Sequence, residues 1–284
     1  MQISQLRFVL LHYHILKNAG TTIEGMLDRS FGKSFCTVDH NERDAHFPND
    51  ALVRLIKQNS LVRALSSHQI HYPVPQEPGF IFFDLCFLRD PIDRLRSIYD
   101  YFREKPADGD AVSAYANELE LGDFIARLIK EMPWYMNDVQ VNLLANGVVN
   151  DCPSKADLER ATLRLMRISF PGVVDCFSES LVAGQYFLHP IFPELDCLAP
   201  ALNVSTKAEK AIGERLVRVR DACSKKVFGE LMDLNAMDLE LLERARQEIR
   251  RRCSLVPAGK SQELSERVRS SSLPQTAPKP AMVG

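Results

Sequence analysis

Apolar runs and helical patterns alternate along the first hundred residues. The run at 6–14 consists of β-forming residues, and the apolar side chains of 21–32 recur at helical spacing. A second buried strand is indicated at 79–90, where Asp90-Pro91 closes the strand and favours the start of a helix. The pattern therefore predicts strand, loop and helix twice in succession, with the second helix running to about residue 103.

The rest of the chain is mainly helical in pattern. Residues 51–68 are predicted to form a helix that leads into a turn, and 170–180 to form a third strand that enters a loop. Further helices are predicted at 111–131, 134–146, 154–167, 206–226 and 236–251. We expect one domain over 1–255 and, because residues 256–284 are polar and rich in Ser and Pro, a disordered C-terminal tail.

Alternating strands and helices favour an α/β fold with parallel strands. Such sheets bind ligands beyond the carboxyl ends of their strands. The segments 14–22 and 89–97 each follow a predicted strand. Both segments should therefore lie at one edge of the sheet, where they form two candidate anion sites.

Composition limits the classes of protein to consider. The 284 residues, 45% of them apolar and 25% charged, suffice for one substantial core. A net charge of −2 gives no global attraction to nucleic acid or to an anionic membrane, so an anion site must be a local cluster. The seven cysteines are scattered without a CxxC pair, which indicates reduced thiols. Neither a signal peptide nor an apolar run long enough to span a bilayer is recognisable, and we expect a cytoplasmic protein.

The first loop, 14–22, carries a lysine, a glycine and two threonines at the start of a predicted helix. A helix N-terminus offers unpaired N–H groups to an anion, Gly20 permits a close backbone approach, and Lys17 adds a charge. The nucleotide-triphosphate loop GxxxxGK[ST] is absent, because the lysine precedes the glycine by three residues. The loop alone is equally consistent with an ordinary turn in which a threonine caps the helix and Lys17 lies in solvent.

The second segment, 89–97, begins with an arginine that ends a strand. The guanidinium of Arg89 suits bidentate phosphate contacts, and Ser97 lies two turns into the following helix. Arg94 and Tyr101 flank Ser97 at spacings of three and four, so they are expected to share its helix face. Alternatively, the two arginines pair with the two neighbouring aspartates as surface salt bridges.

Together the two segments resemble a known family. A loop of the form HIPK(N/T)AG(T/S)(T/S), followed further along the chain by (L/F)RDPxxRxxSxY, is typical of carbohydrate sulfotransferases that use 3′-phosphoadenosine 5′-phosphosulfate (PAPS). The similarity is to the branch with heparan sulfate 2-O- and 6-O-sulfotransferases and their bacterial relatives. Weaker similarities at 173–181, 202–205 and 234–241 extend the resemblance over about residues 8–250.

The resemblance implies a P-loop-like three-layer fold with a central, mostly parallel sheet flanked by helices. It also implies that the first loop binds the 5′-phosphosulfate and that the RDP motif binds the 3′-phosphate. Matched by position, the phosphosulfate contacts are Lys17, Asn18, Ala19, Gly20, Thr21 and Thr22, and the 3′-phosphate contacts are Arg89 and Ser97. Leu16 stands where the family has proline, a departure that removes no ligand.

Sulfonate transfer needs a base at the acceptor hydroxyl and a cation at the leaving phosphate oxygen. His68 falls where the family has a histidine upstream of the RDP strand, and imidazole titrates in the useful range. We therefore predict His68 as the base and Lys17 as the cation, with His71 as the second candidate for the base. Ser67 replaces the glycine usual before the family's histidine, and a structural role for His68 stays open.

The other histidines and the segment 134–140 complete the predicted site. His12 and His14 are expected to pack or to orient the donor, and no catalytic metal is predicted. The segment is similar to a family helix near the acceptor cleft. Its candidate acceptor contacts are Trp134, Tyr135, Asn137 and Gln140.

The leading prediction is a sulfotransferase that moves a sulfonate group from PAPS to an acceptor hydroxyl, expected on a carbohydrate. One alternative is a P-loop nucleotide kinase or phosphotransferase, which would need Mg²⁺ ligands and a glycine-rich loop. The other is a non-catalytic adenosine-bisphosphate-binding protein. The expected partners are the nucleotide donor and a hydroxyl-bearing acceptor, with no nucleic acid and no membrane; the oligomeric state stays open.

Overall fold

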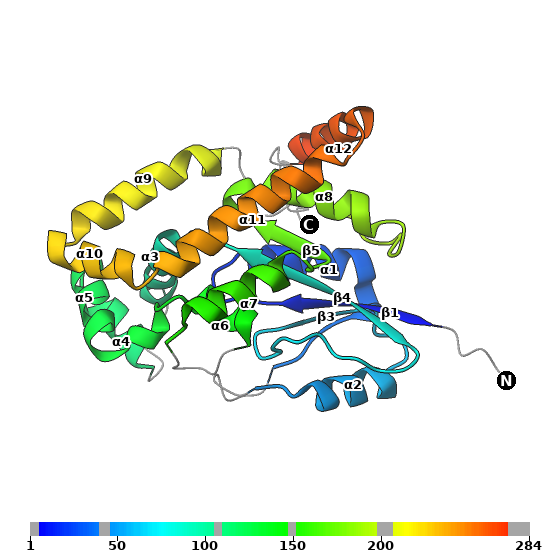
Figure 1. Ribbon diagram of the computed structural model, residues 1–284, viewed down its shortest axis with the longest axis horizontal. Helices are drawn as coiled ribbons and strands as arrows, with labels where there is room; N and C mark the ends of the chain where they lie inside the picture. The colour runs from blue at the N-terminus through cyan, green and yellow to red at the C-terminus, as the bar shows by residue number, and fades with distance from the viewer. Residues whose placement is uncertain (1–5, 40–45, 105–109, 147–151, 198–206, 272–284) are drawn as a thin grey trace, which may run out of the picture.

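The computed structural model describes residues 6–39, 46–104, 110–146, 152–197 and 207–271. Within these ranges a sheet of five parallel strands is flanked by helices (Figure 1). The strands are β1 (Arg7–Tyr13), β2 (Phe35–Thr37), β3 (Ala64–Ser67), β4 (Phe80–Leu88) and β5 (Phe170–Val173), in the order β2-β3-β1-β4-β5. The predicted α/β class is confirmed.

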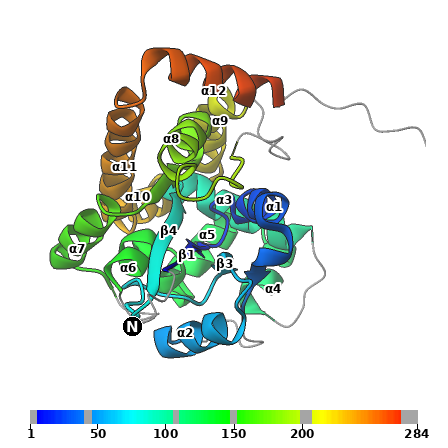
Figure 2. The same ribbon diagram turned by 90° about the vertical axis from the view of Figure 1, so that its right-hand side faces the viewer.

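Alternate residues of the central strand β1 face two separate apolar cores. Val9 and Leu11 belong to one core, whereas Leu10 belongs to the other. The first core is covered by α2 (Asn49–Gln58), α6 (Val139–Ala145), α7 (Lys155–Leu165) and α11 (Ala236–Ser254). The second is covered by α1 (Gly20–Phe31), α8 (Phe177–Leu188) and α12 (Ala258–Ser271) (Figure 2). The sheet and its two helical covers form the predicted three layers.

A third apolar core lies in a helical group at the carboxyl ends of the strands (Figure 1). The group consists of α3 (Pro91–Arg103), α4 (Ala111–Glu118), α5 (Leu121–Glu131), α9 (Lys207–Ala222) and α10 (Lys225–Asp233). Because ligands of parallel sheets bind at this edge, the group forms one wall of the expected site. Among the described helices, none combines the length and the apolar character needed to cross a membrane.

The start of α3 follows the predicted capping pattern. Asp90 Oδ1 accepts hydrogen bonds from the N–H groups of Ile92 at 2.9 Å and Asp93 at 3.1 Å, and Pro91 occupies the first helical turn. The helix ends at Arg103, as expected. This cap fixes the direction in which α3 leaves β4.

The sequence pattern missed two short strands. Residues 51–68 were expected to form a helix and a turn, but α2 ends at Gln58 and β3 occupies Ala64–Ser67. The three-residue strand β2 was not predicted either. Strands of three or four residues are too short to display a period of two, so their pairing decides their structure: β3 pairs with β1, and β2 pairs with β3.

Three predicted helices are each divided, and part of the predicted tail is ordered. The 134–146 segment consists of a 3₁₀ turn at Pro133–Tyr135 and α6, which begins only at Val139. The 111–131 segment breaks at the extended residues Leu119 and Glu120, and the 206–226 segment breaks before Ser224, whose Oγ caps α10. The prediction of disorder is wrong for Ala258–Ser271, which forms α12 and buries Leu264 and Val268 in the second core. The remaining tail, 272–284, lies outside the described residues.

Candidate functional site

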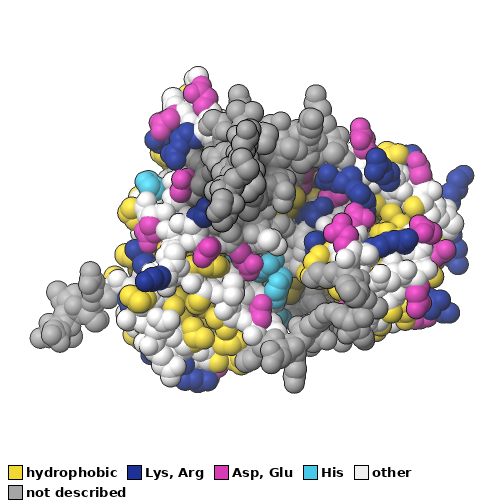
Figure 3. Space-filling view, turned by 180° about the vertical axis from the view of Figure 1, so that it is seen from behind, with side chains coloured by type: hydrophobic (Ala, Val, Ile, Leu, Met, Phe, Trp, Pro, Cys, Tyr) yellow, Lys and Arg dark blue, Asp and Glu magenta, His cyan; other side chains and the backbone are white. Residues whose placement is uncertain are grey.

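Three predicted segments meet at the carboxyl edge of the sheet. β1 lies between β3 and β4, and its register sets Tyr13 beside Ser67. The loop after β1, His68 after β3 and Arg89 after β4 therefore emerge next to one another. On the surface, histidine side chains gather beside acidic ones (Figure 3).

The loop after β1 is a tight turn with two left-handed residues. Lys17 and Ala19 have φ angles of 65° and 63°, a conformation that costs residues with a Cβ about 1 kcal/mol or more. Thr22 N–H donates to the Ala19 carbonyl at 3.0 Å. The amides of Gly20 and Thr21 precede the first intrahelical bonds of α1, so they are the donors that a bound anion would use.

Gly20 is required by its contact with a histidine. A Cβ built on Gly20 would lie 1.6 Å from His14 Nε2 and 2.0 Å from its Cδ2. The imidazole of His14 therefore packs directly on the backbone at the start of α1. The sequence predicted a close approach at Gly20, but it assigned that approach to phosphate rather than to this ring.

Asn18 fixes the loop to the rest of the fold. Its side chain is 2% exposed, and Nδ2 donates at 2.8 Å both to the Phe87 carbonyl and to Gln140 Oε1. Its backbone N–H donates to the Ile15 carbonyl at 3.1 Å. Because both donor groups of Asn18 are used inside the protein, its observed role is to hold the loop on β4 and α6.

Gln140, predicted to contact an acceptor, is an internal bridge. Its Oε1 accepts from the Arg89 N–H and its Nε2 donates to the Arg89 carbonyl, both at 2.9 Å. Asp238 of α11 accepts from the N–H groups of Gln140 at 3.1 Å and Val141 at 2.8 Å. The prediction for Gln140 is wrong because the residue lies at the buried start of α6. Trp134 is exposed, and its acceptor contact stays a prediction.

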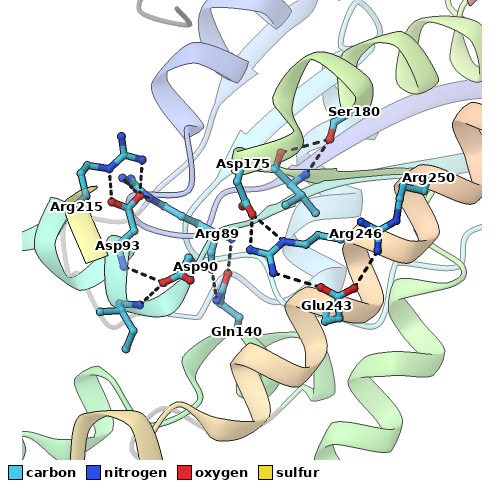
Figure 4. Close-up of polar contacts among 12 residues, drawn as sticks. Arg89, Asp90, Asp93, Gln140, Asp175, Ser180, Arg215, Glu243, Arg246 and Arg250 are labelled. Atoms are coloured by element: carbon cyan, nitrogen blue, oxygen red, sulfur yellow. Dashed lines mark hydrogen bonds and ion pairs between the residues drawn. The ribbon is translucent and has the colours of Figure 1, made fainter. Parts of the chain in front are cut away.

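Arg89 joins the two predicted anion segments. Its Nη1 donates to the Lys17 carbonyl at 2.8 Å, while its Nε and Nη2 contact Asp93 Oδ2 at 2.7 and 2.6 Å. Arg215 of α9 binds the same carboxylate, with 2.6 Å between its Nε and Asp93 Oδ1 (Figure 4). Two guanidinium groups thus share one carboxylate, which leaves a net positive charge beside the loop. The alternative pairing of Arg89 with an aspartate is observed, but in a buried cluster rather than at the surface.

One face of α3 points toward the loop. Asp93 on this face binds Arg89, and the Tyr101 ring lies under the Lys17 ammonium, with Nζ 4.4 Å from the ring centroid. Ser97 is four residues from both, so it lies between them on the same face. Lys17 therefore extends toward α3 rather than into solvent.

Arg94 was predicted to share the helix face of Ser97. Its side chain is buried, and its Nη2 donates to the Tyr135 carbonyl at 3.3 Å. Burial lowers the pKa of this guanidinium. Arg94 is therefore engaged inside the protein, which does not support its predicted grouping with Ser97 at the anion site.

The proton position on His68 follows from its hydrogen bond. His68 Nδ1 lies 2.9 Å from the His14 carbonyl, which can only accept, so Nδ1 carries the proton and Nε2 presents a lone pair. The two rings are in contact, with centroids 3.7 Å apart and 31° between their planes. Burial and the neighbouring His14 lower the pKa of His68, which keeps it neutral near pH 7. A neutral imidazole with a free Nε2 is the form that a base requires.

His71, the second candidate for the base, lines a small cavity with His68. The cavity has a volume of about 20 Å³, which is room for one water molecule. The His71 ring packs against His46 with centroids 4.6 Å apart, and burial lowers its pKa. Both predicted bases therefore border the same space.

A buried polar network behind His68 was not predicted as a unit. Glu24 Oε1 accepts from His14 Nδ1 at 2.9 Å and from Ser66 Oγ at 2.8 Å, and Ser66 Oγ in turn lies 2.9 Å from His12 Nδ1. Burial raises the pKa of Glu24, but the hydrogen bonds from His14 and Ser66 outweigh it, so the net pKa is lowered. Glu24 showed no sequence signal because it lies on a helix face that only the fold brings to the strand.

Among the residues that the structure describes, three side chains of this network could together hold a metal ion. One ligand atom each from His12, His14 and Glu24 lies within 4.8 Å of the others. Burial holds the pKa of His12 well below its ordinary value. The Nδ1 atoms of both histidines are occupied by hydrogen bonds, so a metal bound through them would have to displace those bonds.

Comparison with known proteins gives no function directly. The chain is 25% identical over 243 residues to an uncharacterized protein of Archaeoglobus fulgidus; the match covers 84% of this chain and 96% of the archaeal one. No family model matches the chain. The functional argument therefore depends on the residues at the carboxyl edge.

Proposed function

We propose that the chain is a sulfotransferase that moves a sulfonate group from PAPS to a hydroxyl of a carbohydrate acceptor. The observation that carries the proposal is the 2.8 Å hydrogen bond from Arg89 Nη1 to the Lys17 carbonyl. This bond joins the two segments that resemble donor-binding motifs, although 72 residues separate them in the sequence. A nucleotide with phosphates at its 5′ and 3′ positions needs two such anion sites.

The donor would be held by amides at one end and by guanidinium groups at the other. The N–H groups of Gly20 and Thr21 suit the 5′-phosphosulfate. Arg89 and Arg215 suit the 3′-phosphate, since each retains N–H groups beyond those bound to Asp93. Ser97 adds a hydroxyl between the two ends.

In the proposed reaction the acceptor oxygen attacks sulfur while His68 Nε2 takes the hydroxyl proton. The bond between sulfur and the bridging phosphate oxygen breaks, and the electron pair stays on that oxygen. The Lys17 ammonium stabilises the resulting negative charge. The products are a sulfate ester and adenosine 3′,5′-bisphosphate, with the proton on His68.

A nucleotide kinase has less support from the same residues. The first loop has the single glycine Gly20, which follows the lysine, whereas a phosphate loop of that class has two glycines and a lysine directly after the second. A non-catalytic bisphosphate-binding protein would share the donor site, and only turnover separates it from the enzyme.

The decisive experiment compares nucleotides by thermal shift. Adenosine 3′,5′-bisphosphate at one hundred times its Kd should stabilise the protein by about 2.7 kcal/mol through mass action, whereas ADP lacks the 3′-phosphate and should act more weakly. Preferential stabilisation by ATP with Mg²⁺ would favour the kinase. Absence of any shift with saturating bisphosphate would overturn the proposal.

Binding must then be linked to turnover. Release of adenosine 3′,5′-bisphosphate from PAPS in the presence of neutral and anionic sugars would identify an acceptor. A protein that binds the bisphosphate but transfers sulfonate to none of these acceptors would fit the binding-protein alternative.

A further inference from the structure

Asp39 lies two residues beyond the end of β2, beside the proposed base. Its Oδ1 accepts from the His68 N–H and from Ser67 Oγ, both at 2.9 Å. Ser67 Oγ accepts in turn from the Gln69 N–H at 2.9 Å. One carboxylate oxygen therefore organises three consecutive residues, Ser67 to Gln69, at the end of β3.

His68 is consequently held at two separate points. Asp39 holds its backbone, and the His14 carbonyl holds its ring through Nδ1 at 2.9 Å. Contact with the tilted His14 ring, whose centroid is 3.7 Å away, restricts the plane of the imidazole. With backbone and ring nitrogen held and the ring plane restricted, the direction of the Nε2 lone pair is determined.

We propose that Asp39 is a positioning residue for His68, which it orients through the backbone and whose protonated form it stabilises by its negative charge. The inference depends on the proposed function, because it assumes that His68 accepts the acceptor proton. In other enzymes a carboxylate bound to the imidazole ring orients the histidine. Asp39 would orient His68 through its main-chain N–H instead.

The charges around His68 support this role. Burial and the neighbouring His14 lower the pKa of His68, while the carboxylates of Asp39 and Glu24 act in the opposite direction. When the ring takes up a proton, its charge lies near both carboxylates. Glu24 already accepts from His14 and Ser66, whereas Asp39 binds the His68 backbone itself.

Two substitutions separate geometry from charge. Asp39→Asn removes the negative charge but keeps an oxygen that can accept the two hydrogen bonds. Asp39→Ala removes the charge and the accepting oxygen together. The titration of His68 is followed by NMR on its ring Cε1–H, assigned with His68→Gln. Asp39→Asn should lower the titration midpoint by about half a pH unit and kcat by about threefold, with the donor KM changed less than about twofold.

Asp39→Ala should lower kcat further, because the backbone at His68 is then free to move. The matched control is Asp50→Asn, an exposed carboxylate that pairs with Arg54 on α2 and should change neither quantity. Unchanged titration and unchanged kcat in both Asp39 variants would overturn the inference. An effect of Asp39→Ala alone would keep the orienting role and overturn the role of the charge.

The NMR titration is read without donor or acceptor. If the wild-type chain bound no bisphosphate, the proposed function would fail while the effect of Asp39 on His68 could still be measured. If the chain bound and turned over the donor but His68 titrated identically in both variants, only the inference about Asp39 would fail.

Discussion

The two sides of β1 at the carboxyl edge differ in charge. Toward β4, Arg89 and Arg215 share the carboxylate of Asp93, and the Lys17 ammonium lies over the Tyr101 ring. Toward β3, His68 lies near carboxylates and has a lowered pKa. A cationic side suits an anion, and a side with a neutral imidazole suits proton removal, so the single strand β1 separates two chemical tasks. Substitution of Arg89 or Arg215 on the cationic side should therefore affect binding, and substitution of His68 on the other side should affect turnover.

The largest expected effect is on the imidazole side. His68→Ala removes the proposed base, so kcat should fall about 10²- to 10⁴-fold, while the thermal shift with adenosine 3′,5′-bisphosphate stays unchanged. His71→Ala is the control, because it borders the same small cavity. A greater loss of kcat in His71→Ala would move the role of base to that residue.

On the cationic side the effect should appear in binding. Arg89→Ala removes charged hydrogen bonds that are worth about 1.5–3 kcal/mol, so the Kd for the bisphosphate should rise about 10- to 100-fold. Arg96→Ala serves as the control, since Arg96 lies on α3, the helix that follows Arg89, and pairs with the exposed Asp100 at 3.1 Å. Calorimetry measures the Kd for the bisphosphate in both variants. An equal rise in Kd for the two substitutions would contradict a specific anion site.

Gly20 lies where the two sides meet, and its substitution should act on stability. Gly20→Ala drives a methyl group into His14, so we expect a loss of about 2 kcal/mol in the free energy of unfolding. Adding His14→Ala should restore part of the lost free energy of unfolding. Urea titration of the two single variants and the double variant detects this coupling.

Gly25→Ala on the same helix is the matched control for Gly20→Ala. The added Cβ would meet only the end of a flexible arginine, Arg29, at 3.4 Å. The substitution should be neutral or stabilising by up to about 1 kcal/mol, because alanine favours a helix more than glycine does. Equal losses at the two glycines would show that helix propensity, not the histidine contact, explains Gly20.

The pH dependence of turnover offers a smaller, more specific test. A base must be deprotonated, and burial and His14 lower the pKa of His68 below its usual 6.5. The acid limb of kcat/KM should therefore have its midpoint below pH 6.5, with activity retained above it. A midpoint above 6.5 in steady-state profiles would contradict His68, with its lowered pKa, as the base.

Removal of metal should have the smallest effect. The Nδ1 atoms of His12 and His14 already form hydrogen bonds with Ser66 and Glu24, so a metal bound through either atom would have to displace one of these bonds. EDTA should therefore leave both the bisphosphate thermal shift and the turnover unchanged. Loss of either quantity, with recovery on adding Zn²⁺, would identify a working metal site in this network.

Sequence alone predicted those parts of the site that depend on local pattern. The strands β1 and β4, the Asp90 cap and the position of both loops follow from apolar runs and turn chemistry, which act over a few residues. The strand β3, which carries His68 at its end, was missed because it is only four residues long. His68 itself was found only through the family resemblance.

The partners of the predicted residues could not be found in the same way. Arg215 reaches Asp93 from 122 residues away, and Glu24 meets His14 because α1 folds back on β1. An arginine or glutamate on a helix is usually a solvated surface residue, so neither has a recognisable signal before tertiary packing is known. Gln140 was misassigned for the same reason: its amide is buried by packing at the start of α6.

The bridge through Gln140 has a consequence for shorter versions of this protein. Asn18 in the first loop binds Gln140, and Gln140 binds Asp238 on α11. A fragment that stops before α11 would contain every residue proposed to bind the donor or transfer the sulfonate, yet it would lack the carboxylate that anchors the first turn of α6. The smallest piece of chain able to keep the first loop in shape must therefore extend into α11, beyond the last residue proposed to contact the nucleotide.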